Sequence, residues 1–160
     1  MNADIAALFC RSAPLARLLE EELIALAAQA ESMNYAAGAM ILHPDGGDER
    51  LFVLRHGAVA LRIRMLGSGG RCGGEATFTM ASAGQAFGWA AWVRADRIAV
   101  SACALGPTSL VAVDPRRLRD RHVSLKVGQR MLQVLYGLLQ ESGLCPPNIG
   151  VLLKLGDVMP

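Results

Sequence analysis

The stretch 87-FGWAAWVRADRIAVSACAL-105 contains the residue types that proteins use to hold a phosphate group. A Phe-Gly step leads into a segment with two tryptophans and two arginines, and a run of small residues follows. Glycine allows a close backbone turn, backbone N–H groups at the start of a helical turn attract anions, and an arginine can pair with phosphate bidentately. We therefore treat this stretch as a candidate anion site. Its candidate ligand-binding residues are Phe87, Gly88, Trp89, Ala90, Arg97, Ile98 and Ala99.

Each of these groups also has a purely structural interpretation. Gly88 could serve only as the pivot of a tight turn, and Arg97 could form an ion pair with Asp96 or Glu75. Trp89 could stack on an aromatic ligand, but its bulk favours a side chain that fills the pocket itself. Both interpretations of the stretch remain open at this point.

The remaining reactive side chains show no arrangement that would do chemistry. The three histidines and four cysteines are scattered, without CxxC, HExxH or any other metal-ligand spacing. We expect no metal site, no catalytic residues and no cofactor, and we expect that the protein is not an enzyme. Cysteines scattered in this way are typically reduced thiols, and this predicts a cytoplasmic protein.

Composition predicts one globular domain. The chain has 160 residues, of which 52% are hydrophobic, and a net charge of +2. This size is enough to build a core. No apolar run reaches the ~18 residues that a membrane span needs, and the first residues, MNADIAALFCRSAP, lack the basic and apolar regions of a signal peptide. We expect no membrane insertion.

The elements that must position these residues follow from hydrophobic periodicity. Leucines recur at three- and four-residue steps over 14–32, which predicts one amphipathic helix. From about residue 35, short runs between glycines predict strands, and alternation over 58–66 is typical of a half-buried strand. The segment 67–74 is expected to be a hairpin tip. The expected strands are 39–43, 51–55, 58–66, 76–80, 98–105 and 109–114.

Two helices are expected after the strands. Asp114 followed by Pro115 is a good helix start, and a second helix is predicted over 123–142, ended by Gly143. Val127, Met131, Val134, Leu135 and Leu138 supply one apolar stripe. Leu125, Leu132 and Leu139 form a second stripe at seven-residue spacing. A monomer needs only one stripe, so we predict a two-fold homodimer. The candidate interface residues are Leu125, Gly128, Leu132, Leu135 and Leu139.

This order of elements resembles the cyclic-nucleotide-binding domain of the catabolite-activator family. The matching features are Tyr35-x-x-Gly38, Asp45-Gly46, 53-VLRHGAVAL-61 and 84-GQAFGWAAWV-93, with Arg97 placed like the family's phosphate arginine. The resemblance covers roughly 15–142. It implies an α+β fold: an antiparallel β-roll with an N-terminal helix and two C-terminal helices. The expected organisation is a helical segment 1–33, a β-roll 34–114 with a cassette 84–97, helices 115–143 and a tail 144–160.

One residue departs from the pattern of the nucleotide-binding members. After Phe-Gly those members have a glutamate that accepts a hydrogen bond from the ribose, whereas this chain has Trp89, whose indole has one donor and no acceptor. The chain resembles a subgroup of single-domain relatives with Gly-Trp at this place. We expect a non-enzymatic regulatory, sensor or interaction module that binds cAMP and cGMP weakly or not at all.

Three functions stay open. The module could act through a protein partner, it could be a receptor for a cyclic nucleotide or another small phosphorylated ligand, or, more remotely, it could be a haem or redox sensor. The winged helix-turn-helix of the family's transcription factors needs far more than the 17 residues after Gly143. We therefore expect no specific DNA binding.

Overall fold

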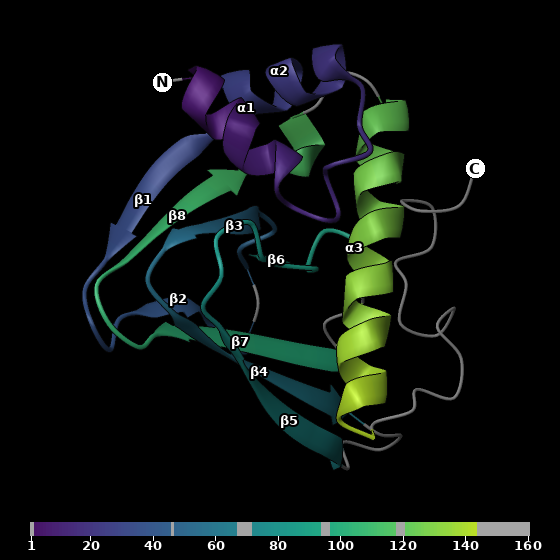
Figure 1. The fold of residues 1–160 in the computed structure, drawn as a ribbon. Coiled ribbons are helices and arrows are strands. Elements are labelled where there is room, and N and C mark those ends of the chain that lie inside the picture. The colour runs from purple at the N-terminus through teal and green to yellow at the C-terminus, as the bar shows by residue number, and fades with distance from the viewer. Residues whose placement is uncertain (1, 46, 67–71, 94–96, 118–120, 144–160) are drawn as a thin grey trace.

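Two antiparallel four-stranded sheets face each other as a β-roll in the computed structural model, which describes residues 2–45, 47–66, 72–93, 97–117 and 121–143 (Figure 1). One sheet has the strand order β1-β8-β3-β6 and the other has the order β2-β7-β4-β5. The strands are β1 (Glu31–Tyr35), β2 (Met40–Leu42), β3 (Leu51–His56), β4 (Val59–Leu66), β5 (Cys72–Met80), β6 (Ala86–Phe87), β7 (Ile98–Ala104) and β8 (Thr108–Val113). The predicted α+β roll is confirmed.

The centre of the roll follows the predicted alternation. In β4, the side chains of Val59, Leu61 and Ile63 are fully buried, while Arg62 and Arg64 between them are exposed. β4 pairs along its length with both β5 and β7. Because alternate residues of a strand point to opposite faces, this pattern turns the apolar side of the sheet into the roll. The two arginines share Glu75 of β5 on the outer side.

The N-terminal segment differs from the single predicted helix. It contains α1 (Asn2–Cys10) and α2 (Glu20–Ala28), joined by turns, and the helical prediction over 14–19 and 29–32 is wrong. The Glu22 carboxylate accepts a hydrogen bond at 2.8 Å from the Leu19 backbone N–H, which caps the helix and fixes its start at Glu20. Leu19 is consequently 62% exposed instead of lying on the apolar face. Residues 31–35 extend into β1 and pair with β8.

The C-terminal helices agree with their predicted bounds. A short 3-10 helix, η2 (Pro115–Arg117), precedes α3 (Arg121–Glu141). The Asp114 carboxylate accepts the Arg116 backbone N–H at 3.0 Å, and Gly143 has a positive φ of 76° just after the helix. Both are common helix-end devices. α3 runs along the side of the roll, with α1 and α2 at one end (Figure 1).

Two predicted features lie wholly or partly outside the described residues. The hairpin tip predicted at 67–74 falls there except for 72–74, which belong to β5, and so does the tail 144–160. Of the strands, β1 and the two-residue β6 were not predicted. The remaining strands match within a few residues.

Candidate functional site

The Phe-Gly step opens a single helical turn at the edge of the roll. Gly88 has a φ of 104°, and a Cβ atom placed on it would lie 2.5 Å from the carbonyl oxygen of Arg50. Only glycine fits such a conformation and approach. The backbone N–H groups of Trp92 and Val93 both donate to the Trp89 carbonyl, at 2.8 and 3.0 Å. The segment is thus one turn long, and the helix N-terminus considered as an anion site is not formed as a full helix.

Both tryptophans of this turn contact α3. The Trp89 indole is 1% exposed, and its Nε1–H donates a hydrogen bond of 2.7 Å to the Met131 carbonyl. The Trp92 ring lies over Gly128, where an added Cβ would come within 2.6 Å of Nε1. A buried indole normally finds an acceptor for its N–H group. The turn is therefore held against the helix by one hydrogen bond and one close ring contact.

A small pocket lies on the roll side of the same turn, and we call it the cassette pocket. Its volume is about 50 Å³. Trp89, Ala90 and Val93 come from the turn, Ile98 and Val100 from β7, and Leu42, His43, Pro44 and Asp48 from β2 and the loop that follows it. Most of these side chains are apolar, and among the described lining residues no arginine or lysine is present.

The structure brings together three of the seven predicted ligand-binding residues. Trp89, Ala90 and Ile98 line the cassette pocket, whereas Phe87, Gly88, Arg97 and Ala99 do not. The buried Phe87 ring stacks on Phe52, with ring centroids 5.3 Å apart. Ala99 pairs with Arg64 in the sheet register.

Arg97 does not line the cassette pocket, although the next residue, Ile98, does. The Nε atom of Arg97 is buried and has no hydrogen-bond partner. The ion pair considered with Glu75 is not formed, because that carboxylate instead pairs with Arg62 and Arg64. The other partner considered, Asp96, lies outside the described residues.

Six lining residues were missed from sequence: Leu42, His43, Pro44, Asp48, Val93 and Val100. His43 and Asp48, which follow β2 in one loop, both lie in the wall of this pocket. The available signal was a histidine and several carboxylates within six residues of a Gly-Gly turn. That signal does not predict where these side chains point, because no periodic pattern fixes the orientation of side chains in a loop.

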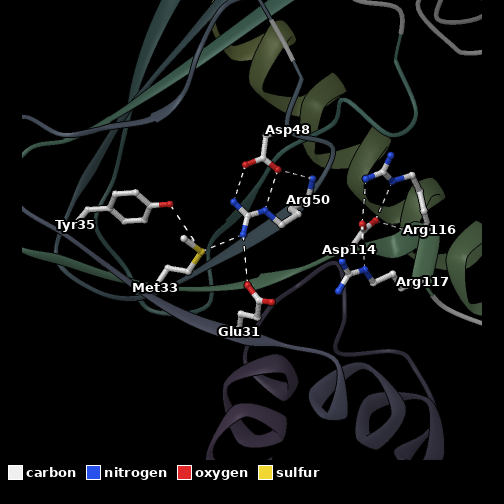
Figure 2. Close-up of polar contacts among 8 residues, drawn as sticks. All are labelled: Glu31, Met33, Tyr35, Asp48, Arg50, Asp114, Arg116 and Arg117. Carbon is white, nitrogen blue, oxygen red and sulfur yellow. Dashed lines mark hydrogen bonds and ion pairs between the residues drawn. The ribbon is translucent and has the colours of Figure 1, made fainter.

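Asp48 also begins a network of charged side chains that extends away from the cassette pocket (Figure 2). Arg50 donates to the two Asp48 oxygens at 3.0 and 2.8 Å, and its Nη1 lies 3.7 Å from Glu31 and 3.1 Å from the Met33 sulfur. The hydrogen bonds from Arg50 lower the pKa of the Asp48 carboxyl. Asp48 is therefore held ionised in the pocket wall.

A second group of ion pairs continues this network at the end of β8. Arg116 donates to both oxygens of Asp114 at 3.0 Å, and Arg117 lies 3.8 Å from Asp114 (Figure 2). Arg116 also lies 3.0 Å from Glu49. The hydrogen bonds from Arg116 lower the pKa of Asp114. The exposed arginines 116 and 117 thus pair with local carboxylates.

The predicted dimer interface needs correction. Leu132, Leu135 and Leu139 are at most 6% exposed, and Gly128 faces Trp92 of its own chain instead of thinning an outer surface. Leu125 is half-buried. Val134 and Leu138, assigned to the inner stripe, are the partly exposed ones. The exposed stripe that motivated these residues as an interface is therefore absent from α3, and dimerisation itself stays a prediction.

Solved structures share this arrangement of strands, turn and helices. A cyclic nucleotide-binding domain from Methylobacillus flagellatus KT superposes with a TM-score of 0.62 at 18% identity, over 88% of this chain and 79% of that one. The chain has the cyclic-nucleotide-binding-domain fold. The N-terminal domain of a transcriptional regulator from Streptomyces coelicolor A3(2) gives 0.56 at 21% identity, over 85% and 92%. A regulatory protein from Silicibacter pomeroyi, proposed to bind cAMP, gives 0.59 at 21% identity, over 91% of this chain and 67% of that chain.

These likenesses concern the cyclic-nucleotide-binding-domain fold and not a function. The sequence matches no protein-family model and no curated protein. Among the described residues, no three histidine, cysteine, aspartate or glutamate side chains gather as a metal site. None of the described helices is long and apolar enough to cross a membrane.

Proposed function

We propose that this chain is a non-enzymatic regulatory or interaction module of the cyclic-nucleotide-binding fold whose cassette pocket is closed by its own Trp89. One observation carries the proposal: the Trp89 indole is buried in the pocket wall and donates its N–H group to the Met131 carbonyl. By the resemblance, a glutamate that binds ribose would stand at this position. The side chain that should meet a ligand instead meets α3.

The size of the cassette pocket supports this function. A small-molecule site usually offers about 300–1,000 Å³, whereas the cassette pocket offers about 50 Å³. A buried water molecule needs a cavity of ~10–15 Å³, so the cassette pocket has room for a few water molecules. A cyclic nucleotide would have to displace Trp89 from α3 before it could enter.

The charge of the pocket wall supports it as well. A bound cyclic phosphate needs a cation or several N–H donors close to its oxygens. The ionised group among the described lining residues is the Asp48 carboxylate, held by Arg50. A carboxylate beside a phosphate raises the free energy of binding by like-charge repulsion.

Calorimetric titration of the full chain with cAMP and with cGMP tests the proposal. We expect no saturable heat at micromolar concentrations of either nucleotide. A matched titration of Asp48→Asn separates the argument from pocket size from the argument from charge. If repulsion by Asp48 were the only obstacle, the Asp48→Asn variant would bind the nucleotide and the unaltered chain would not. A sub-micromolar Kd for the unaltered chain would overturn the proposal.

One observation favours the alternative, a receptor for a small phosphorylated ligand. The buried Nε atom of Arg97 has no acceptor, and an unsatisfied buried donor costs about 1–3 kcal/mol. A ligand oxygen could satisfy it. Under this alternative the titration gives a saturable isotherm that Arg97→Gln abolishes, whereas under the primary proposal Arg97→Gln changes no binding heat.

A further inference from the structure

A second hollow lies between α1, the start of β1 and the end of β3. It shares no lining residue with the cassette pocket. We call it the α1 hollow. Its lining residues are Asp4, Ile5, Ala7, Leu8, Arg11, Ser32, Arg55, His56 and Ala83.

Among the residues that the structure describes, the two arginines of the α1 hollow pair with no carboxylate. Arg50 and Arg116 each chelate an aspartate with two hydrogen bonds. By contrast, Arg55 makes one side-chain hydrogen bond among the described residues, from Nη1 to the Ser32 hydroxyl at 3.4 Å, and the Arg11 side chain makes none with them. Asp4 lines the same hollow but pairs with neither guanidinium. Among the described residues, the hollow is thus lined by two arginines and one aspartate that form no ion pair with one another, and the balance of these charges is positive.

A β-bulge directs the side chains that line the hollow from β3. Leu54 pairs with Leu110 and His56 with Ser109, so Arg55 is the extra residue on its strand. Neighbouring residues of a regular strand point to opposite faces, but a bulge re-aims them. Arg55 and His56 consequently line the same hollow although they are adjacent in sequence.

The remaining lining determines the kind of anion that fits. Two guanidinium groups, the Ser32 hydroxyl and the His56 ring can supply more N–H and O–H donors than the two oxygens of a carboxylate need. A tetrahedral phosphate has three free oxygens when one carries an organic group. Ile5 and Leu8, both less than 10% exposed, and Ala83 form an apolar wall beside these donors.

We propose that the α1 hollow binds a phosphate monoester whose organic group is small and apolar. Arg11 and Arg55 pair with the phosphate, Ser32 and His56 donate to it, and Ile5, Leu8 and Ala83 contact the organic group. This inference is independent of the cassette pocket. It holds or fails whatever binds beside Trp89.

Calorimetric titration of the full chain with phenyl phosphate, and separately with inorganic phosphate, tests the site. We expect saturable one-to-one binding, tighter for phenyl phosphate. Arg11→Gln and Arg55→Gln should each weaken it by about ten- to hundred-fold, because each removes charge-assisted hydrogen bonds. Arg117→Gln is the matched control: this arginine is exposed, lies 3.8 Å from Asp114 and should be dispensable.

Four results would overturn the proposal. The first is that neither probe shows saturable binding, and the second is that binding is unchanged in both Arg11→Gln and Arg55→Gln. The third is that Arg117→Gln weakens binding as much as the hollow variants do. The fourth is equal affinity for the two probes, which would show that the apolar wall does not contact the organic group. Circular dichroism melts of the variants confirm that they are folded. Both arginines have solvent-accessible side chains and no ion pair among the described residues, so their replacement should leave the melting temperature unchanged.

Discussion

Two glycines in α3 should respond oppositely to the same substitution. A Cβ on Gly137 would have no heavy atom within 4 Å, whereas a Cβ on Gly128 would lie 2.6 and 2.8 Å from Nε1 and Cδ1 of Trp92. In a helix interior, alanine is favoured over glycine by about 0.8–1 kcal/mol. Gly137→Ala should therefore stabilise the protein by up to about 1 kcal/mol.

At Gly128 the same gain in helix propensity meets a steric cost. Carbon atoms pack best at about 3.5–4.0 Å, and the Trp92 ring is 2% exposed and cannot swing into solvent. Overpacking of this kind costs about 1–3 kcal/mol. Gly128→Ala should thus be neutral to destabilising by about 2 kcal/mol, and the two variants should differ by about 1–3 kcal/mol.

Urea unfolding of the wild-type protein and both variants measures this difference as a change in midpoint at constant slope. Shortening the opposing ring in Gly128→Ala/Trp92→Leu tests the cause, since the double variant should be more stable than the sum of the two single changes predicts. If Gly128→Ala is as stable as Gly137→Ala, then Trp92 does not pack on α3 as described.

Three further predictions concern the same structure. Trp89→Phe should cost at least about 1 kcal/mol in urea unfolding, because the hydrogen bond to Met131 is lost and the smaller phenyl ring leaves a cavity at a buried site; an unchanged midpoint would contradict this packing. The Leu139→Glu variant should be unfolded by circular dichroism, since a charge at this buried site costs more than about 3 kcal/mol; a well-folded monomeric variant would instead indicate that Leu139 lies on an exposed stripe of α3. Arg50 lowers the pKa of Asp48, so this pair stabilises the fold above the usual aspartate pKa near 3.9 and loses that contribution as the pH falls through the lowered value. Melting temperatures at pH 7 and pH 3 should therefore differ less in Asp48→Asn than in the wild type.

The sequence predicted the parts of the fold in which one side of an element is buried. The alternation of β4 and the helix-end residues Asp114 and Gly143 determined their elements because each acts through near neighbours. Residues 31–35 gave no such signal, since β1 is mostly polar and exists through its pairing with β8. The helix predicted to start at Pro14 is wrong over its first residues. Leu15 and Leu18 are buried although they lie in turns, so the spacing of buried leucines did not mark the start of the helix.

The cassette pocket was predicted only in part for a similar reason. Trp89 could be placed from the resemblance, and its role in filling the pocket agrees with its burial. Asp48 and His43 enter the pocket from a loop that precedes the turn by some 40 residues, a contact that only the folded roll creates. The second stripe on α3 was assigned to an outer surface from the seven-residue spacing of Leu125, Leu132 and Leu139, but Leu132 and Leu139 are buried and Trp92 occupies the space beside Gly128.

The chain has only two tryptophans, and both belong to the turn that contacts α3. Excitation of indole therefore reports on this one junction without any label. Detachment of the turn from the helix would bring both rings from an apolar environment into water, with a red shift of the emission. The protein thus carries its own optical probe, and its emission spectrum in the presence of any added molecule tells directly whether that molecule separates the roll from the helix.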